Sequence, residues 1–381
     1  MKKTLILGGG IGGVVAANLL KKAVGSSMEV MVIDREPMHR YAPSYPLVLT
    51  GEKKPGEICR DLKVLKRKNI EVLNDEITEI DFEARRVFTR NTNLNYDYLL
   101  ISLGLDYHPE AVPGFKEFAF NVYDFKDLSE IRRRLKNFTS GRIVLFVSSL
   151  PIKCSPAPYE IILLVDYYFR RRGNRQQVKL TIVTPEASPE PLAKPKVGLS
   201  IRKLLAERNI ELLTEAKVLA VEEKALVLDS ETKIPADLLL GIAPHWTPKV
   251  LRQTKLTDKN GFVKVNPYTM ETSYPGVYAI GDATSIRLPV IGAYAPKAGV
   301  FTHAQAKVVA KNIARLAKGL KPVYRYDGKG LCMVDIGFGR ACYSRVEYFK
   351  KPQPKITFRK PTRTAHWVKK AYNKYWLKCW F

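Results

Sequence analysis

The chain has 381 residues, of which 46% are hydrophobic, so it is long enough for two or three domains with real cores. Lys and Arg outnumber Asp and Glu by 63 to 37, and the resulting net charge of +26 calls for an acidic partner or surface. No run approaches the length of a transmembrane segment, which is about 18 uninterrupted apolar residues, so we expect no membrane-spanning helix.

The first predicted elements are a short apolar strand over 4–7 and a helix over 14–22, joined by a glycine-rich loop. Its glycines have the GxGxxG spacing of a dinucleotide-binding loop. Gly8 permits the tight turn, Gly10 lets a pyrophosphate approach the backbone, and Gly13 lets helix and strand pack closely. Because the apolar run turns directly into this loop, we expect no signal peptide.

A second apolar run, 29–33, ends in Asp34, where an acid should reach the ribose hydroxyls of an adenine nucleotide. Residues 35–46 are rich in proline and aromatics and predict a loop without a helix, either a wall of the cofactor site or an ordinary surface loop. Short strands and a hairpin are predicted over 64–90. A buried strand then ends in Gly104, which we expect to contact the cofactor.

The next buried strand, 142–147, is of the parallel-sheet type. In a two-dinucleotide flavoenzyme it would open a second nucleotide site with its own GxGxxG loop. Instead it runs into residues 148–158, which contain no glycine and several prolines that cannot offer N–H groups to a phosphate. Cys154 stands where the nicotinamide site would be built. Helix and strand patterns continue over 159–184, so we expect the fold to be kept and the NADH site to be lost.

A strand ending in Gly281 and Asp282 returns the chain to the first cofactor. Two-dinucleotide flavoproteins hold the ribityl chain of FAD in this way, with the aspartate accepting its hydroxyl, which favours FAD over NAD. Lys297, which we expect to contact the cofactor, lies at the start of a long helix predicted to reach about Ala317. We expect the N-terminus of this helix to point at the flavin N1–C2=O edge.

Five cysteines occur, an odd number without any CxxC spacing, which indicates neither a secreted disulfide framework nor a metal site. They are Cys59, Cys154, Cys332, Cys342 and Cys379. In an intracellular chain a disulfide would more readily be redox-active than structural.

The last helix carries an aromatic stripe, formed by Trp367, Val368, Ala371, Tyr372, Tyr375, Trp376 and Cys379. The opposite face is predicted to hold Lys369, Lys370, Asn373, Lys374 and Lys378. Such a helix suits a membrane interface, and the alternatives are packing on the body or a dimer contact. Nucleic-acid binding is not expected, because the cations are spread along the chain and no recognised module occurs.

Several motifs together resemble the sulfide:quinone oxidoreductases, a group of two-dinucleotide-binding flavoproteins, over nearly the whole length. The motifs are Gly8–Gly13, Tyr41–Pro46, Pro151–Pro158, Ala243–His245, Gly276–Asp282, Tyr326–Cys332 and Gly337–Gly339. The resemblance implies an α/β fold with two Rossmann-type domains and a C-terminal membrane-associating region. It also implies that Cys154 and Cys332 form the redox centre beside FAD and pass electrons from sulfide to a quinone.

On this basis we expect a discontinuous FAD domain, 1–112 and 245–320, a second Rossmann-like domain, 113–244, and a C-terminal region, 321–381. Some bacterial members carry a third cysteine in the loop matching 115–140, which this chain lacks. We expect a peripheral position on the cytoplasmic face of a membrane, through residues 364–381, and leave homo-oligomerisation open.

Three side chains have roles that the residues alone leave open. Phe338, between two glycines and six residues after Cys332, is predicted to wall the quinone pocket. Lys153 could favour the Cys154 thiolate or be a solvated surface group. His245 could carry protons or be structural.

Other classes of protein remain as alternatives. A type II NADH:quinone dehydrogenase shares fold, FAD and tail but should keep glycines at 147–154. A flavocytochrome-type sulfide dehydrogenase shares the two cysteines but would be exported. A flavin-bearing or basic adaptor without enzymatic activity would not need either cysteine.

Overall fold

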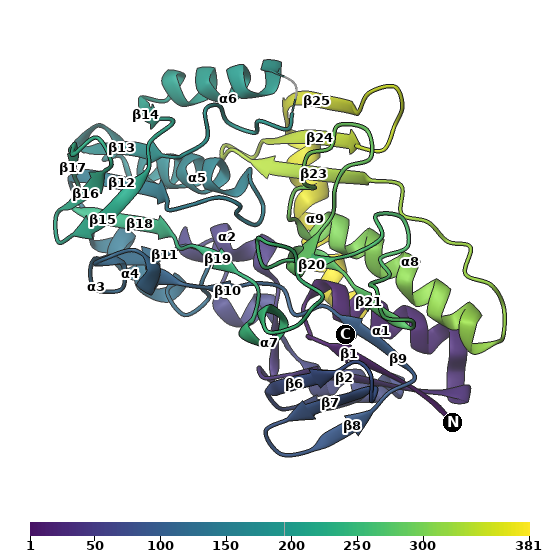
Figure 1. Ribbon diagram of the computed structural model, residues 1–381. Coiled ribbons are helices and arrows are strands. Elements are labelled where there is room, and N and C mark those ends of the chain that lie inside the picture. Colours follow the sequence, from purple (N-terminus) through teal and green to yellow (C-terminus); the bar gives the residue numbers. More distant parts are fainter. Residues whose placement is uncertain (194) are drawn as a thin grey trace.

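Two five-stranded parallel sheets form the frame of the protein in a computed structural model, which describes residues 1–193 and 195–381 (Figure 1). The first sheet has the order β21 (Val277–Ala279), β9 (Tyr98–Ile101), β1 (Lys2–Leu7), β2 (Met28–Asp34) and β5 (Glu71–Asn74). The second has the order β11 (Ala119–Asn121), β18 (Leu238–Ile242), β12 (Gly141–Val147), β13 (Val178–Val183) and β14 (Ile210–Leu213). All neighbouring strands in both sheets are parallel.

The chain builds both sheets by the same path, and we call each sheet with its connections the first and the second unit. Helix α1 (Ile11–Val24) leads from β1 to β2, and α5 (Ala157–Arg172) leads from β12 to β13. Helix α6 (Pro195–Glu207) follows β13. Each unit also holds a three-stranded antiparallel sheet: β6 (Ile77–Asp81), β7 (Arg86–Thr89) and β8 (Asn93–Asn95) in the first, β15 (Val218–Glu222), β16 (Ala225–Leu228) and β17 (Lys233–Pro235) in the second. The predicted α/β fold with two parallel sheets is confirmed.

The C-terminal segment, residues 299–381, ties the units together. Helix α8 (Gly299–Ala317) packs along α1, as Figure 1 shows, and leads to an antiparallel sheet of β23 (Lys329–Asp335), β24 (Ala341–Glu347) and β25 (Lys355–Thr362). Helix α9 (Arg363–Trp380) ends the chain and contacts β23, β24 and α1. Among the described residues, no helix combines the length and apolar content needed to cross a bilayer.

The remaining helices and strands are short. They are α2 (Tyr45–Leu49), α3 (Phe115–Phe118), α4 (Leu128–Asn137), α7 (Lys249–Arg252), β3 (Met38–Arg40), β4 (Cys59–Asp61), β10 (Asp106–Tyr107), β19 (His245–Trp246), β20 (Val263–Lys264) and β22 (Thr284–Ser285).

Two local predictions are wrong. Helix α2 begins inside the loop expected over 35–46. The proline is tolerated, because Pro46 lies in the first turn, where a backbone N–H would have no partner within the helix. The strands expected from residue 64 begin only at β5. Residues Leu62–Lys68 instead form a 3₁₀-helix, which Asp61 caps by accepting the Lys63 N–H.

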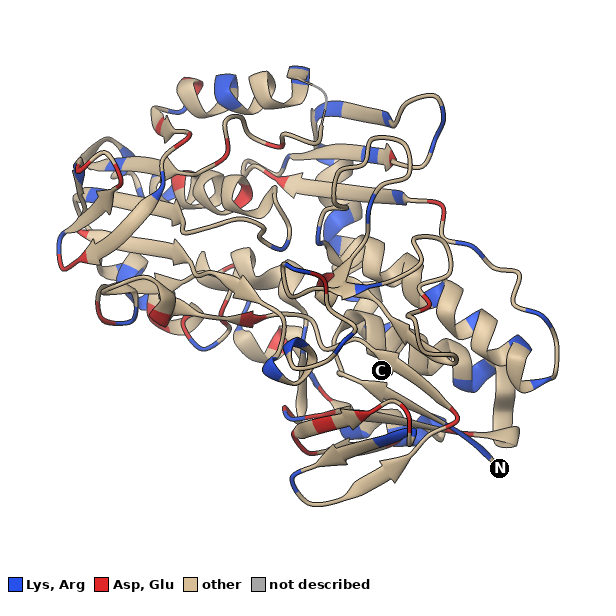
Figure 2. Cartoon of the chain, in the orientation of Figure 1, with Lys and Arg blue, Asp and Glu red and all other residues tan. Residues whose placement is uncertain are grey.

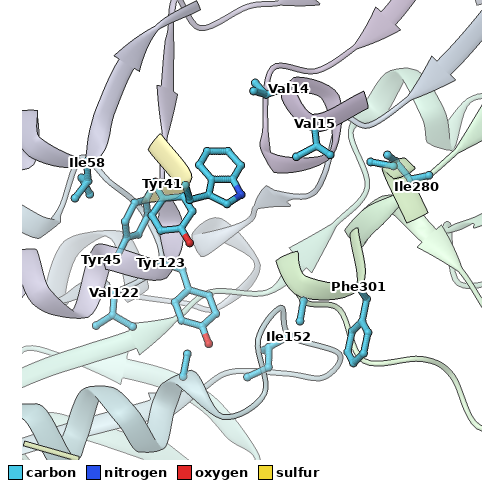
Figure 3. Close-up of a cluster of buried hydrophobic side chains, with 14 of the residues drawn as sticks. Val14, Val15, Tyr41, Tyr45, Ile58, Val122, Tyr123, Ile152, Ile280 and Phe301 are labelled. Carbon is cyan, nitrogen blue, oxygen red and sulfur yellow. The ribbon is translucent and has the colours of Figure 1, made fainter. Parts of the chain in front are cut away.

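A continuous core joins α1 to the loops around it (Figure 3). The labelled members are Val14, Val15, Tyr41, Tyr45, Ile58, Val122, Tyr123, Ile152, Ile280 and Phe301. They come from both units and from α8, so burial of apolar surface holds the two units and the C-terminal segment as one body.

Candidate active site

The loop between β1 and α1 has the geometry that its glycines predict. A Cβ on Gly8 would overlap the Ser102 carbonyl, and a Cβ on Gly13 would overlap the Gly8 carbonyl, so only glycine allows this close packing. Gly10 differs, because a Cβ there would meet no atom within 4 Å. It is the N-cap of α1 and makes no side-chain cap. Gly10, Ile11 and Gly12 line a cavity, so the start of α1 borders open space, as a phosphate site requires.

Two carboxylates lie at the carboxyl ends of the first sheet. Asp34 accepts the N–H groups of Gly9 at 2.6 Å and Glu36 at 2.8 Å, and burial raises its pKa. Asp282 follows β21; burial raises its pKa too, and its Oδ1 atom has no hydrogen-bond partner within the described residues. A ligand hydroxyl would satisfy such a buried oxygen. Together with the open helix terminus at Gly10, these groups fit FAD.

The corresponding loop of the second unit, between β12 and α5, differs because the nearby acid is already hydrogen-bonded within the protein. Tyr159, in the first turn of α5, is buried and donates its hydroxyl hydrogen to Glu186 at 2.6 Å. Glu186 lies shortly after β13, much as Asp34 ends β2, and burial raises its pKa. The carboxylate that would face a ribose is therefore engaged by the protein itself.

Cys154 and Cys332 meet from distant parts of the chain. Cys154 has a φ of 54° in the loop before α5, where its N–H donates to the Lys297 carbonyl and its carbonyl accepts from the Tyr123 hydroxyl at 3.1 Å. Cys332 lies in β23. Burial, and then the neighbouring Cys332, raise the pKa of Cys154 well above its ordinary range. Burial raises the pKa of Cys332 to about 12, so this environment favours neutral thiols.

One cavity of about 1080 Å³ joins the glycine loop to the cysteine pair. Its walls include the predicted residues Gly8, Gly10, Asp34, Gly104, Cys154, Gly281, Asp282 and Cys332. This volume is at the upper end for small-molecule sites, and the walls reach from a nucleotide-type loop to two thiols. Gly13, Lys297 and Phe338 do not line it.

A buried ion pair in the cavity wall was not predicted. Lys369 of α9 contacts Glu160 of α5, and both side chains are 9% exposed. Burial raises the pKa of Glu160, and the charge of Lys369 opposes that rise. Both charges also reach Cys154, whose pKa Glu160 raises and Lys369 lowers. The sequence pattern assigns Lys369 to the outer face of the last helix, so only the tertiary structure reveals the pair.

Helix α9 divides its faces differently from the prediction. Trp376 is buried and stacks on His39 with a centroid distance of 5.0 Å, and Asn373 accepts a hydrogen bond from the Tyr41 hydroxyl. The predicted stripe is therefore split, because Trp376 packs on the first unit while its other large members stay outside. The exposed apolar side chains are Trp367, Val368, Tyr372 and Tyr375, which are between 43% and 67% exposed.

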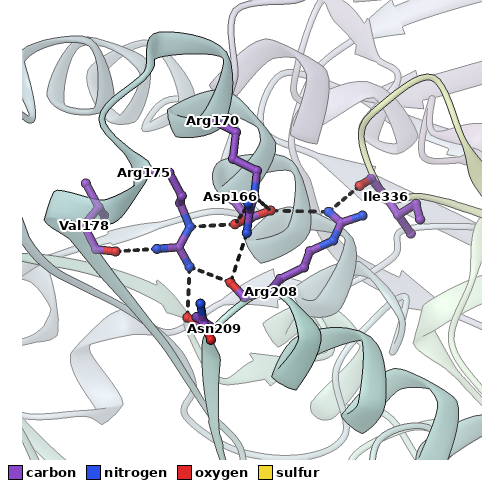
Figure 4. A network of polar contacts seen from close by, with 7 residues as sticks. All are labelled: Asp166, Arg170, Arg175, Val178, Arg208, Asn209 and Ile336. Carbon is purple, nitrogen blue, oxygen red and sulfur yellow. Dashed lines mark hydrogen bonds and ion pairs between the residues drawn. The ribbon is translucent and has the colours of Figure 1, made fainter.

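A network of polar contacts around a buried carboxylate links the two parts of the chain that carry the cysteines (Figure 4). Asp166 of α5 has no exposed side-chain surface and pairs with Arg170 at 2.9 Å, Arg175 at 2.6 Å and Arg208 at 3.4 Å. Arg208 also donates to the Ile336 carbonyl at 2.7 Å, just after β23. The network therefore fixes α5, which follows the Cys154 loop, to the end of the Cys332 strand.

The prediction that Phe338 walls the quinone pocket is not supported by its position. The ring lies in the turn after β23, is 49% exposed, and packs on Tyr167 at 4.7 Å and on the Arg208 guanidinium at 5.0 Å. The reason is strand geometry. β23 continues for three residues past Cys332, roughly 10 Å of extended chain, and the turn that follows places Phe338 on Tyr167 and Arg208.

Three further side chains take local partners. The Lys297 ammonium donates to the carbonyls of Asp282 at 2.7 Å and Thr284 at 3.1 Å, and burial lowers its pKa to about 8. Lys297 thus stabilises the turn at Asp282 through its backbone carbonyls. Lys153 contacts the hydroxyl of Tyr107. His245 is buried with Nδ1 2.7 Å from the Ala243 carbonyl, and burial lowers its pKa to about 3.

Comparison with known proteins gives the chain its relatives. It matches the profile of the family described as Pyridine nucleotide-disulphide oxidoreductase over residues 2–147 and 167–307. The matched ranges leave out both cysteines. The chain is 26% identical over 371 residues to a mitochondrial sulfide:quinone oxidoreductase of Mus musculus, covering 93% of this chain and 80% of that one.

Two further comparisons reach the same group. The chain is 26% identical over 396 residues to a sulfide-quinone reductase of Aquifex aeolicus, covering 99% of this chain and 90% of the relative. The X-ray structure of the sulfide:quinone oxidoreductase from Aquifex aeolicus superposes with a TM-score of 0.91 at 24% identity. That superposition covers 100% of this chain and 91% of that one, and it establishes the shared fold.

Proposed function

Since the chain belongs to the pyridine nucleotide-disulphide oxidoreductase family, we propose that it is an FAD-dependent sulfide:quinone oxidoreductase. The observation that carries the proposal is the single cavity that joins the glycine loop to Cys154 and Cys332. The names of the relatives over nearly the whole chain support the same substrates.

The proposed cofactor site follows from the first unit. The N–H groups at Gly10 would hold the pyrophosphate, Asp34 the ribose and Asp282 the ribityl chain. When bound, FAD supplies a two-electron acceptor that a quinone can reoxidise. We assign this site to a discontinuous domain, 1–112 and 245–320.

The proposed sulfide chemistry belongs to the cysteine pair in its disulfide form. Hydrosulfide attacks one sulfur, the S–S bond breaks, and one cysteine becomes a persulfide while the other leaves as a thiolate holding the electron pair. The pKa of both thiols is raised, so the thiolate is the unstable form and a ready donor. The second domain, 113–244, and the C-terminal region, 321–381, would each supply one cysteine.

The proposed quinone path starts at α9. Val368 and Tyr372 line the cavity and are also 50% and 43% exposed, so the cavity opens at the apolar outer face of this helix. A quinone entering there meets the Glu160–Lys369 pair, which lines the same cavity and carries protons that quinone reduction consumes. We therefore propose this pair, in place of Phe338, as the polar end of the quinone site.

Peripheral membrane binding through 364–381 completes the proposal. Trp367 and Tyr375 are exposed beside Lys370, Lys374 and Lys378, and aromatics with lysines suit an anionic interface. Elsewhere Lys and Arg are spread over many elements rather than gathered along one groove (Figure 2), which disfavours nucleic acid as the partner.

An anaerobic titration tests the proposal against the NADH dehydrogenase alternative. Sulfide should bleach the flavin absorbance of the purified protein, and a short-chain quinone should restore it. NADH should do neither at micromolar concentration, because Tyr159 engages Glu186 in the second unit. Bleaching by NADH but not by sulfide would replace the proposal with the alternative.

A further inference from the structure

A buried carboxyl that the proposed chemistry has not used lies beside the cysteine pair. Glu190 sits in the loop between β13 and α6 with a φ of 56°, a backbone conformation that side-chain-bearing residues rarely adopt. Its Oε1 atom is buried and has no hydrogen-bond partner within residues 1–193 and 195–381. A strained backbone and an unpartnered buried carboxyl oxygen both cost stability, which points to a functional constraint.

The surroundings of Glu190 connect it to both sulfurs. Its charge raises the pKa of Cys332 more than any other charged group does, and it also raises the pKa of Cys154. The Ser155 hydroxyl, next to Cys154 in the chain, donates toward the carboxyl. Glu190 is absent from the wall of the large cavity. It therefore approaches the cysteine pair from outside that cavity, whereas Glu160 and Lys369 lie in its wall.

Resting on the proposed function, we propose that Glu190 is the acid–base group for sulfide, accepting its proton as the sulfur attacks Cys332. The carboxylate takes one proton from hydrogen sulfide. A bond forms between the sulfide sulfur and the Cys332 sulfur, and the Cys332–Cys154 bond breaks. The products are a neutral Glu190 carboxyl, a Cys332 persulfide and a Cys154 thiolate that holds the electron pair. The quinone, through the flavin, is the oxidant that removes this pair.

The charge change explains why a carboxylate can stand beside two thiols. While ionised, Glu190 disfavours a nearby thiolate, and once protonated it no longer does so. Proton transfer thus removes the repulsion at the step in which the thiolate forms. Burial raises the pKa of Glu190 to about 7. The Ser155 hydroxyl lowers this pKa and the charge of Glu186 raises it further, so both protonation states are accessible near neutral pH. The other titratable groups that interact with it are Tyr123, Cys154, Tyr159, Cys332 and Tyr348.

Flavin bleaching by sulfide in the FAD-loaded protein tests the inference. Glu190→Gln should slow bleaching on the order of 100-fold below neutral pH. The defect should shrink at alkaline pH, where hydrosulfide is already ionised in solution. Glu190→Asp should recover part of the rate. The control is Glu207→Gln, an exposed glutamate of α6 that pairs with Lys203 at 3.8 Å, and it should change the rate by less than about twofold.

A second readout does not depend on turnover. In the reduced protein, Glu190→Gln removes a negative charge beside the thiols, so iodoacetamide should alkylate Cys332 faster at a given pH. Slower bleaching together with faster alkylation supports the inference. Wild-type bleaching rates across the pH range, or unchanged alkylation, would overturn it. If sulfide fails to bleach even the wild-type flavin, the proposed function fails, while the alkylation result still decides whether Glu190 controls the thiols.

Discussion

The loop after β1 and the loop after β12 hold the same place in two sheets with the same connections, yet they present opposite surfaces to a ligand. In the first, Gly10 leaves the N-terminus of α1 open. In the second, Tyr159 of α5 engages the acid that follows the next strand, and the loop carries Cys154 instead of glycines. The comparison teaches that one chain path can present an open helix terminus in one copy and a cysteine in the other, depending on a few loop residues.

The largest expected effect comes from the second loop. Cys154→Ser or Cys332→Ser should lower sulfide-dependent quinone reduction on the order of 1000-fold or more, because each sulfur is half of the attackable bond. FAD content, read from absorbance, should stay unchanged, since neither cysteine builds the first loop. Cys342→Ser, in the neighbouring strand, is the control and should remain active. Substantial activity in either variant would indicate that both cysteines serve only in packing.

The first loop should fail in two separable ways. Gly13→Ala forces a methyl group into the Gly8 carbonyl and should cost about 3 kcal/mol of unfolding free energy, or more, by overpacking. Gly10→Ala meets no protein atom, so the protein should keep its stability but lose FAD. Chemical denaturation and flavin content distinguish the two. Equal FAD retention in both variants would mean that the phosphate does not approach Gly10.

Helix α9 covers the first unit, so its two faces should respond differently. Trp376→Ala should cost about 3–5 kcal/mol because the ring is buried against His39. The matched change Trp367→Ala, on a ring 67% exposed, should cost less than about 1 kcal/mol and instead weaken sedimentation with anionic vesicles. Because this segment includes the buried Trp376, deleting 364–381 should destabilise the fold and also abolish membrane binding. Normal vesicle binding by a Trp367→Ala, Tyr375→Ala double variant would contradict the interface assignment.

Two buried neutral histidines, His39 and His245, predict loss of stability in acid. Burial lowers the pKa of His39 to about 4 and that of His245 to about 3, below the ordinary value near 6.5. Between these values the unfolded chain binds the proton and the folded chain does not. Stability should therefore be complete above about pH 6.5 and fall toward pH 4 by about 1.4 kcal/mol per pH unit per histidine. Denaturant melts across this range should show a smaller slope for His39→Gln; an equal slope would assign the acid effect to other groups.

The smallest effect concerns the Tyr159–Glu186 hydrogen bond of the second unit. Tyr159→Phe removes the hydrogen bond to buried Glu186 but keeps the ring, and should cost about 1–3 kcal/mol. NADH should still fail to reduce the flavin, because the loop offers no glycine cradle. Reduction by NADH in this variant would mean that one hydroxyl, rather than the loop, had closed the site.

The sequence by itself determined the features that depend on local sterics. The roles of Gly8 and Gly13 follow from backbone space, and the departure at 148–158 follows from prolines where a phosphate loop needs free N–H groups. The order of strands and helices follows from hydrophobic pattern, which responds to burial on one or both faces. The resemblance to known flavoproteins, rather than any local pattern, paired Cys154 with Cys332.

Only the tertiary structure decided which distant side chains share a wall. Glu160 meets Lys369 because α9 packs on β23 and β24, which brings this lysine to α5, and periodicity alone had assigned it to solvent. Phe338 is six residues from Cys332 in sequence, but the end of β23 and a turn lie between them, and the ring packs on Tyr167 and does not line the cavity. Glu190 could not be singled out among 37 acidic residues until burial and the two sulfurs were seen together. Burial and charge coupling arise from contacts between distant segments, and a linear pattern does not contain them.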